Sequence, residues 1–508
     1  MKQAAESHNA FSWSRVSLAL LLVMVLPLGA LAQQSVEPQA RSPQASAQAQ
    51  PKETAKPEHR MTEAEKQELF ASFDQILKFA SNDTGLPIKG PVNHKVVGRD
   101  EVEKYMLERM KEDPDTLKLD RSEISLKKFG LIPKDMNLRS YLVALLKEQI
   151  AGFYDSKTKI MYMLDWVDPA SQKPVLAHEL THALQDQNFD LEKWGQVNDK
   201  KLNDYDEMVR DEQRAARQAA IEGQATVVLV DYFLSPYGKS VASDPDIVDQ
   251  IKKQMVSSGS TPLFAKAPTF LKLALMFPYD SGFDFERTML AAGGKLQGYA
   301  GVFRNPPDDT RQILEPKTYL DQQHQPLPKL ADLPKVVGKD FEKFDDGGFG
   351  EFDVQIMVKQ WMPSTPPEQQ SDLAAAASKS VHRPDADLAL VHAWRGGYYM
   401  SFHRKSAKPE DKDAPVFIAF FLHLATEQAA KNFENVYRSG LKQRYKSLAA
   451  KPGGVIETED GPVTLTVDGE WFTATEGFDT ALARKISDAM LTTAREGSNT
   501  ASKPAAAN

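Results

Sequence analysis

The chain has no cysteine among its 508 residues. This absence excludes a disulfide framework, a thiolate nucleophile, an all-cysteine zinc site and a lipid-modified N-terminal cysteine. Any metal must therefore be held by His, Asp and Glu. The chain also has no excess of basic residues, because 62 Lys and Arg stand against 70 Asp and Glu, with a formal charge of -8. This balance argues against nucleic acid as the main partner.

Long apolar runs are scarce as well. After residue 32, no segment reaches the ~20 consecutive apolar residues that span a bilayer. Hydrophobic residues make up 41% of the chain and charged residues 26%. These values are ordinary for globular proteins, so collagen, a coiled coil or general disorder fits poorly. The length allows about three folded units.

The first 32 residues have the pattern of a secretory signal peptide. Lys2 and Arg15 precede an apolar run from Leu18 to Leu28, and Ala30-Leu31-Ala32 supplies the small residues that a signal peptidase accepts. We expect cleavage after Ala32 and a secreted or periplasmic protein with no transmembrane helix. An uncleaved anchor is the less favoured alternative, because the apolar run is shorter than the ~20 residues that a membrane span needs.

Composition and periodicity divide the rest of the chain into five parts. The expected fold class is α+β. We expect a disordered linker at 33–60, a mainly helical domain with a small edge sheet at 61–361, a second linker at 362–385, a smaller α+β domain at 386–495 and a disordered tail at 496–508.

Within these parts, the spacing of apolar residues predicts individual elements. In the first domain we expect three or four lead-in helices, a hairpin or edge strand over 152–164, helices at 174–187, 205–234, 246–258, 265–276 and 284–292, and an irregular stretch at 305–340. In the second we expect strands at 388–394, 398–403 and 416–424, a helix at 427–445, a hairpin formed by 462–467 and 470–475, and a helix at 478–491.

The segment His178-Glu179-Leu180-Thr181-His182 carries the strongest chemical signal. On a helix, positions i and i+4 share a face, so both imidazoles can reach one cation while Glu179 lies beside them. The flanking residues are apolar, which predicts a buried helix where two unliganded histidines would be costly to desolvate. The alternative is a pair of ordinary core histidines.

Catalytic zinc takes three protein ligands and keeps one position for water, so a third ligand is needed. Glu222 is the candidate, because it lies among small and apolar residues on the predicted helix 205–234. We expect Gly223 and the neighbouring alanines to let this helix approach the HExxH helix closely. The alternative is a surface glutamate paired with Arg217 or a lysine.

His178 to Gln187, with Glu222-Gly223 on a following helix, resembles the gluzincin branch of zinc metallopeptidases, the thermolysin-like HExxH clan, and in particular a group of secreted bacterial proteins. The resemblance covers about residues 100–490, and its weaker matches are Gly152-Phe153-Tyr154-Asp155, Phe277 to Phe283, and Gln312 to Pro316. It implies a Zn²⁺ site of His178, His182 and Glu222. It also implies an edge strand at 151–164 that pairs with an extended substrate.

The chain departs from this family at two places. Thermolysin-like members carry an Asp four residues after the third ligand, where this chain has Thr226, and Asp186 is the candidate to orient a zinc-bound histidine instead. By analogy a His is expected where this chain has Glu315. The group that stabilises the oxyanion is therefore unassigned.

The sequence thus predicts a secreted or periplasmic zinc metallopeptidase that hydrolyses peptide or protein substrates, a hydrolase with Glu179 as the general base acting on a zinc-bound water. The alternative is a non-catalytic, zinc-stabilised binding protein of the cell envelope. His392, His403 and His423 are expected on strands with no carboxylate at ligand spacing, and Asp345 to Gly348 is expected to form a turn.

Overall fold

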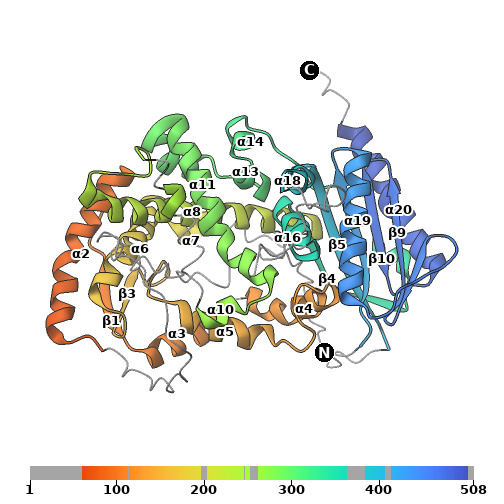
Figure 1. The fold of residues 1–508 in the computed structure, drawn as a ribbon, viewed down its shortest axis with the longest axis horizontal. Helices are drawn as coiled ribbons and strands as arrows, with labels where there is room; N and C mark the ends of the chain where they lie inside the picture. Colours follow the sequence, from red (N-terminus) through yellow and green to blue (C-terminus); the bar gives the residue numbers. More distant parts are fainter. Residues whose placement is uncertain are drawn as a thin grey trace, which may run out of the picture.

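A computed structural model describes residues 60–112, 114–195, 203–244, 246, 248–251, 261–362, 384–406 and 414–501 of the chain. The predicted signal peptide, nearly all of the linker 33–60 and most of the linker 362–385 lie outside these residues, as does 252–258 of the helix expected at 246–258. The prediction of a mainly helical α+β protein with two separate sheet regions is confirmed (Figure 1).

Four helices precede residue 152, in line with the three or four lead-in helices expected: α2 (Glu63–Thr84), α3 (Arg99–Glu112), α4 (Pro114–Lys128) and α5 (Leu138–Gln149). The first begins with a capping box, in which Thr62 and Glu65 satisfy each other's backbone N–H groups. It ends at Gly85, whose φ of 73° is a left-handed conformation that glycine adopts without strain. Its apolar side packs against the helix that carries the HExxH segment.

The small sheet has three strands in the order β1-β3-β2, with bounds Asn93–Val97, Ile160–Leu164 and Gly152–Asp155. The strand β3 pairs antiparallel with β2, as the predicted hairpin requires, and parallel with β1, which the sequence analysis did not foresee. Because β3 lies in the middle, β2 has one edge free of strand partners within the described part of the chain.

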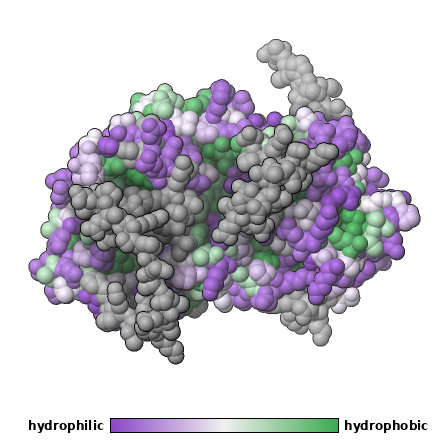
Figure 2. All heavy atoms as spheres, viewed as in Figure 1, coloured by the Kyte–Doolittle hydropathy of each residue, from purple (hydrophilic) through white to green (hydrophobic). Residues whose placement is uncertain are grey.

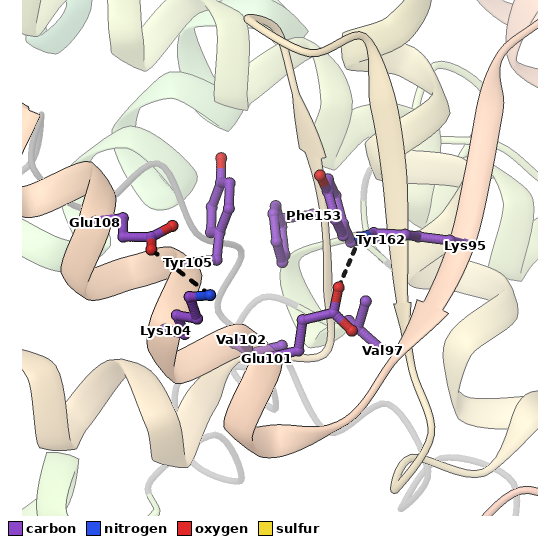
Figure 3. Close-up of a pocket in the computed structure, with 9 residues that line it drawn as sticks. All are labelled: Lys95, Val97, Glu101, Val102, Lys104, Tyr105, Glu108, Phe153 and Tyr162. Carbon is purple, nitrogen blue, oxygen red and sulfur yellow. Dashed lines mark hydrogen bonds and ion pairs between the residues drawn. The ribbon is translucent and has the colours of Figure 1, made fainter.

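Aromatic side chains hold β2 against α3 (Figure 3). Phe153 and Tyr162 stack with their ring centroids 4.5 Å apart, and Tyr105 lies 4.9 Å from Phe153. These rings line a cavity of about 220 Å³, with the ion pair of Lys95 and Glu101 beside it. Since successive strand residues point to opposite faces, the residue after Phe153 faces away from α3.

Three long helices form the centre of the first region: α6 (Pro169–Phe189), α8 (Asp204–Leu234) and α11 (Thr269–Lys295). The first begins five residues earlier than predicted, because Asp168 caps it and Pro169 occupies its first turn. The predicted helices 265–276 and 284–292 fall largely within α11, which continues through Pro278 to a break at Gly293 and Gly294. A π-helix, η3 (Leu296–Gly301), follows it.

Helices α8 and α11 approach each other closely at two glycines. A Cβ atom at Gly223 of α8 would overlap the carbonyl oxygen of Gly282 on α11, and a Cβ at Gly282 would overlap the carbonyl oxygen of Ala219. The expectation that Gly223 admits the HExxH helix is therefore wrong. The glycine faces α11, while a neighbouring face of α8 packs against α6.

The second region is a sheet of seven strands in the order β4-β5-β6-β10-β9-β8-β7, in which every neighbouring pair is antiparallel. The strand bounds are β4 Phe341–Gly348, β5 Trp394–Arg404, β6 Phe417–Leu424, β7 Ala449–Ala450, β8 Val455–Thr458, β9 Gly461–Asp468 and β10 Trp471–Glu476. Its first two strands, β4 and β5, come from opposite sides of the predicted linker 362–385.

Helices α19 (Glu427–Arg444) and α20 (Thr480–Ala501) cover opposite faces of this sheet (Figure 1). Phe472 of β10 packs against Phe433 of α19, whereas the next residue, Thr473, contacts Ser487 of α20. Adjacent strand residues point to opposite faces, so the sheet lies between the two helices. The last of these helices extends six residues past the predicted domain end at 495.

Two local predictions in this region are wrong. Residues 388–394 were expected to form a strand, but most of them belong to helix α18 (Pro384–His392). The apolar run at 388–391 is compatible with either a strand or a helix. Hydrophobic periodicity cannot distinguish a strand from a helix over so few residues. Asp345 to Gly348 is not a turn, because it forms the end of β4 and pairs with β5. Trp394, Tyr398 and Tyr399 are buried.

Short helices connect the larger elements. They are α7 (Leu191–Gly195), η2 (Ser235–Tyr237), α10 (Pro262–Ala265), α12 (Val302–Arg304), α13 (Thr310–Leu314), α14 (Pro316–Leu320), α15 (Leu333–Val337) and α16 (Glu351–Trp361). Hydrophilic side chains cover much of the face seen in Figure 2, and apolar ones gather toward its middle. Among the described residues, the structure has no helix with the length and apolar character of a membrane span.

Candidate metal centre

Helix α6 brings His178 and His182 together. They lie one turn apart on the same face, and their Nε2 atoms are 3.0 Å from each other. The rings are nearly perpendicular, with an interplanar angle of 84°. Every residue of α6 from Val175 to Asp186 is buried, as the apolar flanks predicted.

Glu222 of α8 reaches the same point from the second helix. Its Oε2 atom lies 3.1 Å from Nε2 of His178 and 3.3 Å from Nε2 of His182, while its Oε1 accepts a hydrogen bond from Gln218. The side chain is only 3% exposed. Arg217 instead donates to the carbonyl of Trp194. The alternative of a surface glutamate paired with Arg217 is therefore wrong.

Glu179 lies beside this triangle and contacts the free edge of the small sheet. Its Oε2 accepts a hydrogen bond of 2.7 Å from the backbone N–H of Tyr154, and its Oε1 has no hydrogen-bond partner in the described structure. One ligand atom each from His178, Glu179 and His182 fall within 4.8 Å of one another. Glu222 lies closer to both imidazoles, so it is the better third donor, and Glu179 is a neighbour with an unpaired oxygen.

The four side chains influence one another's ionisation. For Glu222, burial opposes ionisation, but the charge of His182 and the contact with His178 outweigh it and lower the pKa to about 2. Burial also opposes the charge on His182, yet the Glu222 carboxylate raises its pKa to about 9. Burial lowers the pKa of His178 and raises that of Glu179 to about 8.

These directions describe the site without a metal. The directions of these pKa shifts favour a protonated His182, whose Nε2 lies 3.3 Å from Oε2 of an ionised Glu222 and 3.0 Å from Nε2 of a neutral His178. The Nε2 proton of His182 thus lies among the same three atoms that could coordinate a metal ion. A metal can bind only after that proton leaves, because the imidazole lone pair must be free.

Metal affinity should therefore increase with pH. The pKa of His182 is raised to about 9, so protons compete with the metal at every pH below that value. We expect the apparent association constant for zinc to rise about tenfold per pH unit from roughly pH 6 to pH 8 and to level off near pH 9. Competition with a chelator of known pH dependence measures this slope. A constant affinity from pH 6 to 8 would mean that no proton leaves His182 on binding.

The partner of His182 on its other nitrogen differs from the expected Asp186. Nδ1 of His182 lies 2.8 Å from Oε1 of Gln185. Asp186 points elsewhere, since it accepts hydrogen bonds from the Tyr154 hydroxyl and from Lys159. Thr226, at the position of the family's Asp, donates only to the backbone carbonyl of Glu222. Sequence reasoning missed Gln185, although one helical turn from His182 was a searchable position.

Three further histidines of the described residues, His392, His403 and His423, lie outside this centre. Nδ1 of His392 lies 2.8 Å from Oε1 of Glu351 and 3.7 Å from Oε1 of Glu315, two carboxylates that are distant from it in the sequence. These three residues could also hold a metal by proximity. However, Nε of Arg311 lies 2.7 Å from Glu315 and already supplies a positive charge. His392 also ends a helix rather than lying on a strand.

His423 and His403 lie on strands, as predicted. Nε2 of His423 is 3.2 Å from Oε1 of Glu470, an exposed carboxylate at the surface of the sheet. His403 stacks on Phe344 with the ring centroids 4.2 Å apart. Neither belongs to a group of three metal-ligating side chains in the described residues.

Comparison with known proteins finds no matching family model, no matching curated protein and no matching solved structure. The resemblance to zinc metallopeptidases accordingly depends on the buried His178-Glu179-His182 group and on Glu222. This group can accept a metal ion by its donor atoms and their spacing.

Proposed function

We propose that the chain is a zinc-dependent metallopeptidase of gluzincin type, in which His178, His182 and Glu222 hold the metal and Glu179 is the general base. The observation that carries this proposal is the meeting of two imidazole nitrogens and one carboxylate oxygen at 3.0 to 3.3 Å, with a second carboxylate beside them.

The donor set fits zinc. Two donors that each lie about 2.0–2.1 Å from a tetrahedral zinc ion are about 3.4 Å apart, close to the separations in this triangle. Imidazole nitrogen with one carboxylate oxygen is also a combination that zinc accepts. A bound zinc ion would polarise the scissile carbonyl and lower the pKa of a water molecule toward ~7.

Glu179 has the surroundings that a general base needs. The backbone N–H of Tyr154 fixes one carboxylate oxygen, which leaves the unpaired Oε1 to take a proton from water. Burial raises the pKa of Glu179 to about 8 in the metal-free protein, and a cation held by the neighbouring side chains would lower it. The same carboxyl group can then pass the proton to the leaving amine.

The edge of β2 supports a peptide as the substrate. An extended peptide can pair with the free edge of a strand through backbone hydrogen bonds alone. In this protein that edge lies next to the base, because the N–H of Tyr154 contacts Glu179. A peptide paired with β2 would pass beside Glu179 and the three metal-binding side chains.

A second candidate function is supported by burial. His178, Glu179, His182 and Glu222 are only 1%, 2%, 7% and 3% exposed, and structural zinc sites are closed in this way. The chain would then be a zinc-stabilised binding protein of the cell envelope. Zinc analysis combined with hydrolysis of an unstructured protein separates the two candidates, since only a peptidase loses its cleavage with a chelator and regains it with zinc.

We also propose that the protein acts outside the cytoplasm. The charged start, apolar middle and Ala30-Leu31-Ala32 of the N-terminus support export. We expect mature protein from the native host to begin at Gln33, as determined by N-terminal sequencing of the extracellular and periplasmic fractions. Recovery of chains that still begin at Met1 in the membrane fraction would favour an anchored form instead.

A further inference from the structure

Two buried glutamines connect His182 to the backbone of the π-helix. Oε1 of Gln185 lies 2.8 Å from Nδ1 of His182, and its Nε2 donates to Oε1 of Gln224 at 2.9 Å. Nε2 of Gln224 donates in turn to the carbonyls of Gly298 and Tyr299, at 3.0 and 3.3 Å. Both glutamines are completely buried.

The polarity of this chain of hydrogen bonds is set by its far end. A backbone carbonyl can only accept, so the Gln224 amide must turn its NH₂ toward Gly298 and Tyr299 and its oxygen toward Gln185. Gln185 must then direct its NH₂ to Gln224. The carbonyl of Ile221, which accepts from the same NH₂ at 3.1 Å, imposes the same orientation. The oxygen of Gln185 therefore faces His182.

The oxygen of Gln185 determines which nitrogen of the His182 imidazole carries a proton. An amide oxygen accepts but cannot donate, so Nδ1 of His182 must carry a proton to satisfy it. A neutral imidazole that is protonated at Nδ1 has its lone pair at Nε2, the atom that faces His178 and Glu222. Fixed acceptors on the backbone thus determine which nitrogen of His182 is free for a metal.

We propose that Gln185 and Gln224 are positioning residues that hold His182 with Nδ1 protonated and Nε2 open to the metal, an inference that rests on the proposed zinc site. They replace the carboxylate that was expected at this place, and they add no charge to a buried site. The outer partners of metal-bound histidines typically contribute ~10- to 100-fold to metal affinity.

We call the hydrogen-bonded chain from His182 through Gln185 and Gln224 to the carbonyls of Gly298 and Tyr299 the relay. The residue type at position 298, where the relay ends, also matters. A Cβ atom at Gly298 would overlap Oε1 of Glu286 and crowd the side chain of Leu290. A larger residue at position 298 of the π-helix would have to displace the side chains of Glu286 and Leu290, so glycine fits best at the first of the two positions whose carbonyls accept from Gln224. π-helices are rare and are frequently found at functional sites, which fits this role.

The test uses methionine, which keeps the length of glutamine but has no amide. Gln185→Met should weaken zinc binding by ~10- to 100-fold, and Gln224→Met by less, because the Ile221 carbonyl still orients Gln185. Gln187→Met is the matched control: Gln187 lies on the same helix and also bonds to backbone groups, at Lys89 and Gly90, away from the site. Its zinc affinity should equal that of the native protein.

A second measurement, nitrogen-15 NMR, reports directly on the tautomer of His182. In the zinc-loaded native protein, nitrogen-15 spectra of the histidines should show a slowly exchanging Nδ1 proton on His182, and in Gln185→Met this proton should shift and exchange faster. Circular dichroism establishes that each variant is folded, and Gln224→Met replaces Gln185→Met if the latter does not fold. Native zinc affinity with an unchanged Nδ1 signal in a folded variant would overturn the relay, whereas absence of zinc from the native protein would overturn the metal site itself.

Discussion

Glu179→Gln should reduce peptide hydrolysis by ~10² to 10⁴, with the loss toward the upper end of this range, while zinc stays bound. The substitution keeps the size of the side chain, and its amide oxygen can still accept the N–H of Tyr154. It leaves His178, His182 and Glu222 in place. What it removes is a group able to accept a proton from water and return it to the leaving amine.

This experiment compares native and Glu179→Gln proteins with equal zinc content on an unstructured protein substrate. Glu192→Gln is a suitable control, because Glu192 lies on α7, where it accepts a hydrogen bond from Ser156 outside the four-residue cluster. The control should cleave like the native protein. Equal cleavage by Glu179→Gln would assign the activity to another group or a contaminant, and no cleavage by any of the proteins would favour the binding-protein candidate.

His178→Ala and His182→Ala should each abolish stoichiometric zinc, and Glu222→Gln should weaken it strongly. Each histidine supplies one of three protein donors, and two remaining donors cannot complete a four-coordinate site with a single water. An uncharged amide at 222 would also leave the buried cation without its carboxylate partner. Metal analysis after dialysis against a weak chelator measures the stoichiometry.

The ligand assignment has a clear competitor. If Glu222→Gln retained native zinc affinity, Glu222 would not be the third donor, and Glu179 would be the next carboxylate to test because it falls within 4.8 Å of both imidazole donors. Glu212, a more distant acid of α8, is bonded to Thr310 instead. A variant at Gln218, which holds the other oxygen of Glu222, should cause a smaller loss of zinc than Glu222→Gln.

The sequence predicts those parts of the candidate site whose residues lie close together in the chain. His178, Glu179 and His182 lie within one helical turn and a half, so the helix period alone brings them together. Glu222 could be found because a charged residue stood among small and apolar ones on a second long helix. The contact between α6 and α8 that unites them is nonlocal, and only the structure gives its distances.

Most of the parts that were missed depend on contacts between distant segments. Gln185 lies one helical turn from His182, but the contacts that fix its orientation, with Gln224 and through it with the carbonyl of Gly298, involve distant segments. The strand β1 is five residues long and acquires its role by pairing with β3, about 65 residues later. His392 meets Glu351 and Glu315 across a sequence distance that no spacing rule covers.

The glycine contact between α8 and α11 has a consequence for the stiffness of the site. Side chains at a helix interface can change rotamer, but Gly223 and Gly282 meet backbone to backbone and have nothing that can yield. Helix α11 is therefore a rigid stop against one side of α8, one residue from Glu222. The segment of α8 that carries Glu222 consequently has little freedom to move toward α11.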